Sequence, residues 1–455
     1  MSKVIAAIST PISPAGLGVI RVSGDGAVEL AAQVFSPVNQ ARALTALAGY
    51  QAAYGHVADA EGVIDECVAT VFRAPHSYTG EDVVEFSCHG GVYLLQRTLR
   101  ALFAVGAAPA AAGEFTRRAF LNGKMDLTRA EAVMDLIGAE GRLAAKTALA
   151  TREGAVFQAL QPVKEQLIDW QAQIAAFVDY PDDDIPELDP LVLENGLENA
   201  VATLSRLLES YDAGRILRAG VDTVIVGSPN VGKSTLMNCL AGCDRSIVTD
   251  VAGTTRDVVE ESVRVGELTL RLSDTAGIRD TEDQVEAIGV ERSRKRLESA
   301  ALILAVFDSS RELSSDDKAL IDSLPKDTTI AILNKQDLSA KVNKEYIIDK
   351  FQHTVCMEAA NGSGKDELIE AITRVTGLHR LDEAEPVLAS ERQRDCVVRA
   401  REALQEAVEA VRAGLSQDAV AVSVDGALAA LLELTGERAT EAVVNGIFAR
   451  FCVGK

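Results

Sequence analysis

The segment GSPNVGKST, at 227–235, constrains the fold of this chain more than any other stretch because of its two flanks. The apolar run VDTVIV (221–226) precedes it, and the helix-like LMNCLAG (236–242) follows it. A glycine-rich loop between a strand and a helix lets backbone N–H groups surround a phosphate at the helix N-terminus. The sequence therefore predicts a P-loop in an α/β domain, with Lys233 reaching the phosphates and Ser234 binding Mg²⁺.

Further motifs follow in the order of a GTP-binding domain. Thr255 in GTTRD lies where a threonine would complete the Mg²⁺ shell, and Asp274 and Gly277 form an Asp-x-x-Gly element. NKQD (334–337) follows the strand-like TTIAILN, and its carboxylate can accept from N–H groups that guanine has and adenine lacks. In EAANGSG, Glu358 stands where serine is usual in the last base-contacting element. The predicted GTP contacts are Asn230, Val231, Gly232, Lys233, Ser234, Thr235, Thr249, Asp250, Val251, Ala252, Gly253, Thr254, Thr255, Asp274, Thr275, Ala276, Gly277, Asn334, Lys335, Asp337, Glu358, Ala359 and Ala360.

Ile278 follows the Asp-x-x-Gly element, where Ras carries the glutamine that orients the attacking water. An isoleucine cannot orient water. The chain therefore either only binds nucleotide or hydrolyses it with groups from elsewhere. Glu282, Asp283 and Glu286 are nearby acids, and their spacing does not choose among them.

Periodicity along the chain predicts a multidomain α/β protein. Short strand-like runs with one helix indicate an α+β domain at 1–121, and strands alternating with helices indicate a Ras-like P-loop domain at 218–379. Helical patterning at 122–217 and again at 380–455 predicts one discontinuous all-α domain into which the nucleotide domain is inserted. Thr128 and Glu131 have the spacing of a capping box at the first of these helices.

Composition and net charge limit which functions the chain can have. The formal net charge of −22 argues against the chain being the main holder of a nucleic acid, because such binding needs Lys and Arg to neutralise phosphates. Seven scattered cysteines are typical of reduced thiols. No apolar run approaches the roughly 20 residues of a membrane span, so we expect a cytoplasmic protein without a membrane partner.

Several longer stretches resemble one family. GSPNVGKST, TDVAGTTRD and DTAGIR, together with SYTGEDVVEFSCHGG, GEFTRRAFLNGKMDL and the terminal FCVGK, are similar to the MnmE (TrmE) tRNA-modification GTPases over essentially the whole chain. The resemblance implies an N-terminal folate-binding and dimerisation domain, a helical domain and an inserted GTPase domain, in a homodimer.

The resemblance also implies how hydrolysis proceeds without the glutamine. In this family a potassium ion near the P-loop supplies positive charge, and a glutamate orients the water. The matching potassium ligands are Asn230, Thr249, Val251 and Thr254, and the matching catalytic residues are Glu286 and Lys233. A fixed cation stabilises charge that develops on the phosphoryl oxygens, much as an arginine finger does.

For the N-terminal domain, the resemblance implies a site for a 5-formyl-tetrahydrofolate-type donor. The matching residues are Arg21, Glu85, Lys124 and Lys455. A carboxylate can read the amide-like edge of a pterin, and Arg or Lys suits the anionic glutamate tail. Cys452, near the chain end, is either a reactive thiol or part of an apolar tail packed against the N-terminal domain.

The resemblance also implies the function, which is GTP-dependent modification of the wobble uridine of certain tRNAs. An FAD-dependent partner of the MnmG/GidA type would join the chain in a heterotetramer or larger complex, hold most of the tRNA, and share in adding an aminomethyl or carboxymethylaminomethyl group at C5. Two alternatives are a ribosome-assembly GTPase or RNA chaperone, and a folate-dependent transferase that its GTPase domain only regulates. The first predicts a basic extension, whereas the C-terminal segment is apolar and acidic.

Overall fold

The computed structural model describes residues 3–180, 186–241, 261–266, 268–272, 300–380 and 386–455. The chain divides into two compact units, one of Met1–Met134 with Leu428–Lys455 and the other of Asp135–Ala427. The predicted mixed α/β fold with a helical region and a P-loop domain is confirmed. The four segment boundaries given above stay predictions.

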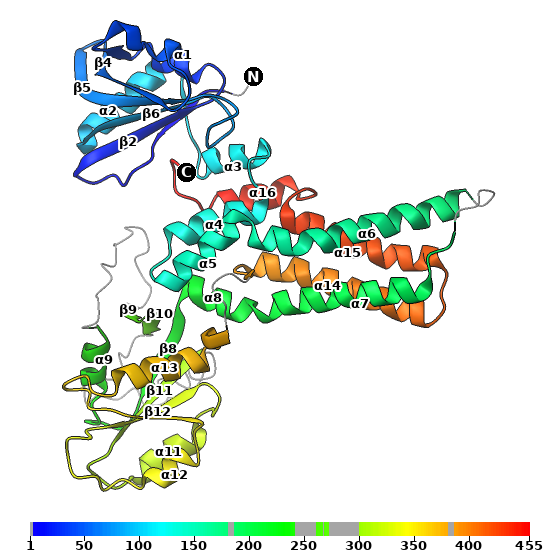
Figure 1. Cartoon of the computed structure of the whole chain (residues 1–455). Coiled ribbons are helices and arrows are strands. Elements are labelled where there is room, and N and C mark those ends of the chain that lie inside the picture. The colour runs from blue at the N-terminus through cyan, green and yellow to red at the C-terminus, as the bar shows by residue number, and fades with distance from the viewer. Residues whose placement is uncertain (1–2, 181–185, 242–260, 267, 273–299, 381–385) are drawn as a thin grey trace. The chain divides into compact units, whose positions relative to one another are not determined.

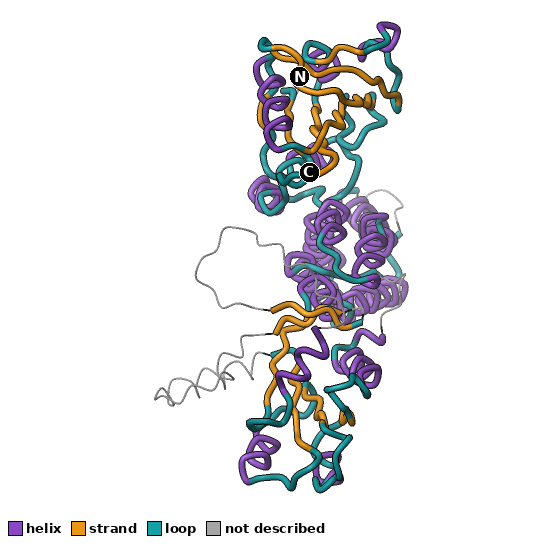
Figure 2. Tube along the Cα trace, turned by 90° about the vertical axis from the view of Figure 1, so that its left-hand side faces the viewer, coloured by secondary structure: helices purple, strands orange, loops and turns teal. Residues whose placement is uncertain are grey.

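Seven strands of the described residues form the sheet of the first unit, in the order β3-β4-β5-β6-β2-β1-β7 (Figures 1 and 2). They are β1 (Ile5–Ile8), β2 (Ala15–Ser23), β3 (Phe35–Pro37), β4 (Gln51–Asp59), β5 (Gly62–Phe72), β6 (Val83–Gly90) and β7 (Ala108–Pro109). Neighbouring strands run antiparallel except β1 and β7, which run parallel. Two short 3₁₀ turns, η1 (Gln40–Arg42) and η2 (Leu44–Ala46), precede β4.

The two faces of this sheet differ. The helices α1 (Ala27–Ala31) and α2 (Val92–Ala104) pack on one face, where Ile20, Val22 and Phe86 are fully buried. Side chains alternate along a strand, so Arg21 and Glu85 lie on the opposite face. There Phe115, from α3 (Glu114–Leu121), packs with residues of β1. The second face therefore combines charged and aromatic side chains.

The helix α4 (Leu127–Ile137) and the C-terminal helix α16 (Glu441–Phe448) meet in a separate apolar cluster that includes Leu127 and Phe448. The predicted capping box at Thr128 and Glu131 is wrong. Asp126 caps α4 instead, because its carboxylate accepts from the backbone N–H groups of Thr128 (2.8 Å) and Arg129 (3.0 Å). The helix begins one residue earlier than Thr128, so that residue lies within its first turn.

Helices from both sides of the nucleotide domain pack together in the second unit. They are α5 (Arg142–Glu153), α6 (Ala155–Asp179), α7 (Pro190–Glu209), α8 (Tyr211–Ala219), α14 (Glu391–Arg412) and the part of α15 (Gln417–Thr435) up to Ala427. Figure 1 shows α7 and α14 side by side, and the Arg412 guanidinium on α14 pairs with Glu194 (2.6 Å) and Glu198 on α7. The predicted packing of the two helical segments is thus confirmed for these helices.

Six described strands form the sheet of the nucleotide domain, in the order β13-β12-β11-β8-β10-β9. They are β8 (Val221–Val226), β9 (Glu261–Val265), β10 (Leu268–Leu272), β11 (Leu302–Asp308), β12 (Thr329–Asn334) and β13 (His353–Cys356), and they are followed by the 3₁₀ turn η3 (Leu378–Arg380). All pairs of described strands are parallel except β9 with β10, which run antiparallel.

Both faces of this sheet are covered. Every residue of β11 and β12 is buried, as is usual for central strands of a parallel sheet. One face packs on α9 (Lys233–Ala241) and α13 (Lys365–Val375), and the other on α11 (Ser315–Ser323) and α12 (Lys344–Ile348). This arrangement brings the loops at the carboxyl ends of β8, β11 and β12 to one edge, where ligands of open α/β sheets bind.

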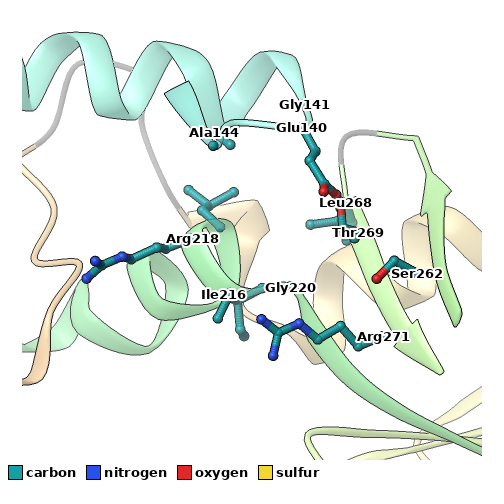
Figure 3. A pocket seen from close by; sticks show the side chains of 13 residues that line it. Glu140, Gly141, Ala144, Ile216, Arg218, Gly220, Ser262, Leu268, Thr269 and Arg271 are labelled. Carbon is teal, nitrogen blue, oxygen red and sulfur yellow. Dashed lines mark hydrogen bonds between the residues drawn. The ribbon is translucent and has the colours of Figure 1, made fainter. Parts of the chain in front are cut away.

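A cavity of about 170 Å³ lies in the second unit beside β10 (Figure 3). Glu140 and Thr269 meet at its wall, where the Thr269 hydroxyl donates to the Glu140 carboxylate at 2.6 Å. Arg218, also in the lining, pairs with Asp135 at 2.8 Å. None of its lining residues belongs to the predicted GTP or folate contacts. Within the described residues, no helix combines the length and apolarity needed to cross a bilayer.

Candidate functional site

The P-loop runs from the end of β8 to the start of α9, and two of its glycines cannot carry a side chain. Gly227 has φ +149°, and a Cβ there would lie 2.4 Å from the Val306 carbonyl oxygen. Gly232 has φ +102°, and a Cβ there would lie 2.2 Å from Nδ2 of Asn334. Both contacts are too short for a side chain to fit. The backbone therefore curls tightly around the N-terminus of α9, a shape that suits a phosphate.

Lys233 and Ser234 open α9 at the centre of this loop. The Lys233 ammonium donates to the carbonyls of Gly227 (2.7 Å) and Ser228 (2.9 Å). Ser234 and Thr235 are exposed in the first turn of the helix. A hydroxyl, an ammonium and a helix N-terminus are a donor set that would fit a Mg²⁺-bound phosphate, with Ser234 as the expected metal ligand.

Asn334, the last residue of β12, joins the phosphate loop to the base-side loop. Its buried amide donates to the Val231 carbonyl at 2.9 Å and accepts from the Ala359 N–H at 3.0 Å. Asp337 is exposed shortly after it. Residues predicted to contact the base and residues predicted to contact the phosphates are therefore held together by one side chain.

Lys335 supports the neighbouring turn of the P-loop. Its ammonium donates to the Asn230 carbonyl (2.8 Å) and pairs with Asp308 (2.6 Å) at the end of β11. Burial opposes ionisation of Asp308, but hydrogen bonds from Lys335 and Ser310 outweigh it and hold the pKa of this carboxyl below its usual range. Asn230 has φ +64°, a left-handed conformation that asparagine tolerates better than most residues.

The last base-contacting element forms a tight turn after β13. Glu358 pairs with Ser363 across an isolated antiparallel bridge, and the N–H of Gly362 donates to the Glu358 carbonyl at 2.9 Å. Gly364 has φ +85°, and a Cβ there would lie 2.2 Å from the Cys356 carbonyl oxygen. The turn presents Ala359 toward Asn334 and leaves Ala360 exposed.

Many predicted residues of the switch segments lie outside the described residues. They are Thr249, Asp250, Val251, Ala252, Gly253, Thr254, Thr255, Asp274, Thr275, Ala276, Gly277, Ile278 and Glu286. The structure therefore shows where Asn230 and Ser234 lie. The roles of these two residues as metal ligands stay predictions, as do those of the other expected potassium and magnesium ligands and of the water-orienting glutamate.

In the N-terminal domain, Arg21 is the centre of a charged cluster. It faces Glu85 across β2 and β6 and pairs with it at 2.8 Å. The rings of Tyr78 and Phe115 lie 5.4 and 5.5 Å from its guanidinium carbon. Only 14% of the Arg21 side chain is exposed, against 27% for Glu85. An aromatic-lined, half-buried ion pair fits a flat, polar-edged ring such as a pterin.

The C-terminal tail lies against the same residues. The Gly454 carbonyl accepts from the Ser9 hydroxyl (3.1 Å) and from Arg21 (3.4 Å), and the Lys455 carbonyl accepts from the Phe115 N–H (3.1 Å). Gly454 has φ +97°, and a Cβ there would lie 2.5 Å from the Ile8 carbonyl oxygen. The tail is therefore packed against the N-terminal domain, and the Cys452 side chain is nevertheless exposed.

The fourth predicted folate residue makes a different contact. The Lys124 ammonium donates to the Pro75 carbonyl at 2.9 Å. The structure thus brings Arg21, Glu85 and the backbone of Lys455 together. Lys124, between α3 and α4, instead contacts Pro75 on the loop that follows β5.

Comparison with known proteins identifies the family of the chain. A family model described as the MnmE helical domain matches residues 127–452, and one described as the GTP-binding protein TrmE N-terminus matches residues 4–124. The tRNA modification GTPase MnmE of Thermoanaerobacter pseudethanolicus is 39% identical, with 99% of each chain covered. The chain belongs to the MnmE family.

Another relative and a solved structure extend the comparison. The MnmE protein of Natranaerobius thermophilus is 40% identical, again over 99% of both chains. A crystal structure of an Aquifex aeolicus Era variant bound to GDP and AlF4⁻ shares 28% identity over 40% of this chain and 66% of its own, with a TM-score of 0.27.

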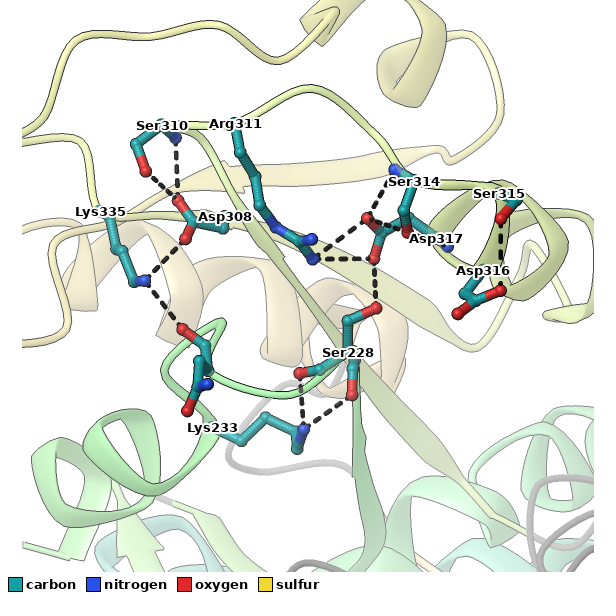
Figure 4. A network of polar contacts seen from close by, with 12 residues as sticks. Ser228, Lys233, Asp308, Ser310, Arg311, Ser314, Ser315, Asp316, Asp317 and Lys335 are labelled. Atoms are coloured by element: carbon teal, nitrogen blue, oxygen red, sulfur yellow. Dashed lines mark hydrogen bonds and ion pairs between the residues drawn. The ribbon is translucent and has the colours of Figure 1, made fainter.

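The motifs shared with the MnmE family did not reveal every residue around the P-loop. The Ser228 hydroxyl donates to Asp317 of α11 at 2.6 Å, and Arg311 pairs with the same carboxylate at 3.2 Å (Figure 4). Asp308 was missed as well. A capping-box spacing at Ser314 and Asp317 was present in the sequence, but it indicates a helix start and not a contact with the P-loop.

Proposed function

We propose that this chain is a GTP-hydrolysing tRNA-modification protein. The observation that carries the proposal is the convergence at Asn334, which ties the phosphate-side carbonyl of Val231 to the base-side N–H of Ala359. Membership of a family whose curated members are named tRNA modification GTPases supports the substrate class. The loops that would read guanine and hold phosphates thus act as one site.

In the proposed reaction, the residues of this chain bind and orient GTP. Lys233 and the N-terminus of α9 hold the β- and γ-phosphates, and Ser234 and Thr255 hold Mg²⁺. Asp337 reads guanine. Asn230 and residues of TDVAGTT hold K⁺, which supplies positive charge near the transferring phosphoryl group, and Glu286 orients the water that Ile278 cannot.

The N-terminal domain is proposed to hold the one-carbon donor. Glu85 would read the pterin edge, Arg21 and Lys455 would hold the anionic part of a 5-formyl-tetrahydrofolate-type ligand, and Lys124 would contact it from its loop. The exposed Cys452 lies on the tail that Arg21 contacts. In the cytoplasm, a homodimer of the chain would act with an FAD-dependent partner that holds most of the tRNA, and the complex would modify C5 of the wobble uridine.

Hydrolysis of GTP in K⁺ and in Na⁺, at matched ionic strength, tests the GTPase part of the proposal. We expect K⁺, but not Na⁺, to raise the hydrolysis rate strongly, and we expect the Asn230→Gly variant to lose this increase. Glycine adopts the left-handed conformation of Asn230 without strain, so this variant removes the amide oxygen and keeps the backbone. Equal slow rates in both salts would reject potassium activation.

Nucleoside analysis tests the modification part. Unmodified tRNA is incubated with the chain, GTP and a reduced folate, with and without the FAD-dependent partner. We expect a new C5-substituted uridine at the wobble position only when both proteins are present. A product formed without the partner would favour a free-standing transferase, and no product with both proteins would contradict the proposed modification.

A further inference from the structure

A side chain far from the nucleotide motifs reaches the P-loop. Asp317 lies in the first turn of α11, and its Oδ1 accepts from the Ser228 hydroxyl at 2.6 Å (Figure 4). Ser228 is the residue after Gly227 in the loop, and its carbonyl accepts from Lys233 at 2.9 Å. The hydroxyl and the carbonyl of one residue thus connect α11 to the lysine expected to reach the phosphates.

The two carboxylate oxygens of Asp317 accept hydrogen bonds from different residues. Oδ2 accepts from the N–H and the hydroxyl of Ser314, both at 2.9 Å, and completes the capping box of α11. Oδ1 accepts from Ser228. Helix capping therefore needs only one oxygen, and the other is directed at the P-loop.

The environment makes the Ser228 bond strong. The Asp317 side chain is 3% exposed, and Arg311 neutralises it from the solvent side at 3.2 Å. Burial opposes ionisation, but hydrogen bonds from Ser228 and Ser314 and the charge of Arg311 outweigh it and hold the pKa of Asp317 below its usual range. A hydrogen bond to a charged acceptor is worth more than one between neutral groups.

Other contacts fix the turn that follows. Lys335 holds the Asn230 carbonyl and Asn334 holds the Val231 carbonyl. Both of these residues come from the NKQD motif, and only the Ser228 contact comes from α11. Without it, Ser228 would keep its contact with Lys233 but lose its side-chain contact with α11.

We propose that Asp317, covered by Arg311, is a positioning residue that holds Ser228 and so keeps the P-loop in the conformation that binds nucleotide. The inference rests on the proposed binding of guanine nucleotides. If the loop adopts its binding form only part of the time, the apparent dissociation constant rises by the inverse of that fraction. A loop held in place by Asp317 therefore binds the nucleotide more tightly and releases it more slowly.

The test measures release of a fluorescent GDP analogue and its equilibrium affinity, with the full chain. Ser228→Ala removes the contact with Oδ1 and leaves the capping box intact. We expect about tenfold faster release and about tenfold weaker affinity, the size expected for losing a charge-assisted hydrogen bond. Ser228→Thr keeps a hydroxyl and should restore values near those of the wild type.

Two variants separate positioning from stability. Asp316→Asn is the matched control, because Asp316 is the adjacent acid on α11, is exposed, and accepts a long hydrogen bond from the Ser315 hydroxyl at 3.4 Å. It should leave release unchanged. Asp317→Asn should accelerate release, and adding Ser228→Ala in that background should accelerate it little further, because the first change already takes the charge from the same contact and weakens it.

The possible outcomes separate the positioning role from its alternatives. The positioning role would be overturned if Ser228→Ala and Asp317→Asn both released GDP at the wild-type rate. Additive effects of the two substitutions would show that they act independently, which would also overturn it. Loss of thermal stability without altered release would leave Asp317 as a helix cap only. A wild-type chain that binds neither GDP nor GTP would instead reject the proposed function itself.

Discussion

Asn334 and Val231 are joined by a buried hydrogen bond of 2.9 Å, although 103 residues separate them in the sequence. Asn334 ends β12 and Val231 lies in the P-loop after β8, with β11 between the two strands. The bond therefore depends on the strand order of the sheet. It also gives Asn334 a role in the phosphate loop in addition to its place in the base-reading motif.

Replacing Asn334 by alanine should weaken both stability and nucleotide binding. The substitution would leave the Val231 carbonyl and the Ala359 N–H without their partner in a buried place, at a cost of about 1–3 kcal/mol for each unsatisfied group. Urea denaturation and nucleotide titration measure the two effects. Gln352→Ala, at an exposed position in the same domain, is the control and should change neither. Unchanged stability in Asn334→Ala would contradict the bridging role.

Replacing Arg21 should reduce binding of a reduced folate by about tenfold or more, because a charge-assisted, aromatic-stacked group is lost. Isothermal titration calorimetry with 5-formyl-tetrahydrofolate measures this change in affinity. Arg97→Ala is a matched control, because Arg97 pairs with Asp59 at 2.7 Å in the same domain and is similarly half-buried. We expect that control to keep folate binding. Equal affinity in Arg21→Ala and in the wild type would remove Arg21 from the site.

His89 and Asp65 should make part of the stability of the N-terminal domain depend on pH. A hydrogen bond to the buried Asp65 carboxylate, and then its charge, raise the pKa of His89. A folded pKa above the unfolded value of about 6.5 means that the pair stabilises fully below that value. Its contribution is lost as the pH rises through the raised pKa.

NMR titration of the His89 ring protons checks this expectation. In Asp65→Asn the carboxylate is gone, so the midpoint should fall toward about 6.5. The wild-type chain should also lose some stability between about pH 6.5 and the raised pKa, and the variant should not lose it. Identical titration curves for the two proteins would show that Asp65 does not set the pKa.

Alkylation should separate the cysteines by exposure. Cys356 and Cys452 are exposed, whereas Cys67 and Cys88 are buried, and a hydrogen bond with Cys88 followed by burial raises the pKa of the Cys67 thiol. Because the thiolate is the reacting form, iodoacetamide should label the exposed pair first and leave Cys67 intact. Peptide mass spectrometry gives the rates, and the urea-unfolded chain, in which all sites should react, is the control. Early labelling of Cys67 would be inconsistent with the buried pair.

Local patterns predicted much of the molecule. The glycine-rich loop between a strand and a helix indicated the P-loop at 227–235. The structure explains two of its glycines, because the backbone at Gly227 and Gly232 leaves no room for a side chain. Hydrophobic periodicity likewise separated the helices around the nucleotide domain from its strands. The sequence pattern placed the cap of α4 at Thr128, whereas Asp126, two residues earlier, caps the helix. Both residue types can cap a helix, and spacing does not distinguish them.

The sequence by itself therefore determined the motifs, the order of the elements and the chemical groups available for phosphate and guanine. The tertiary structure alone decided which distant residues support them. Asp317 reaches Ser228, and Gly454 lies on Arg21, only because the strand order of each sheet and the path of the tail bring these segments together. Sequence spacing carries information over a few residues, whereas such contacts depend on how whole elements pack.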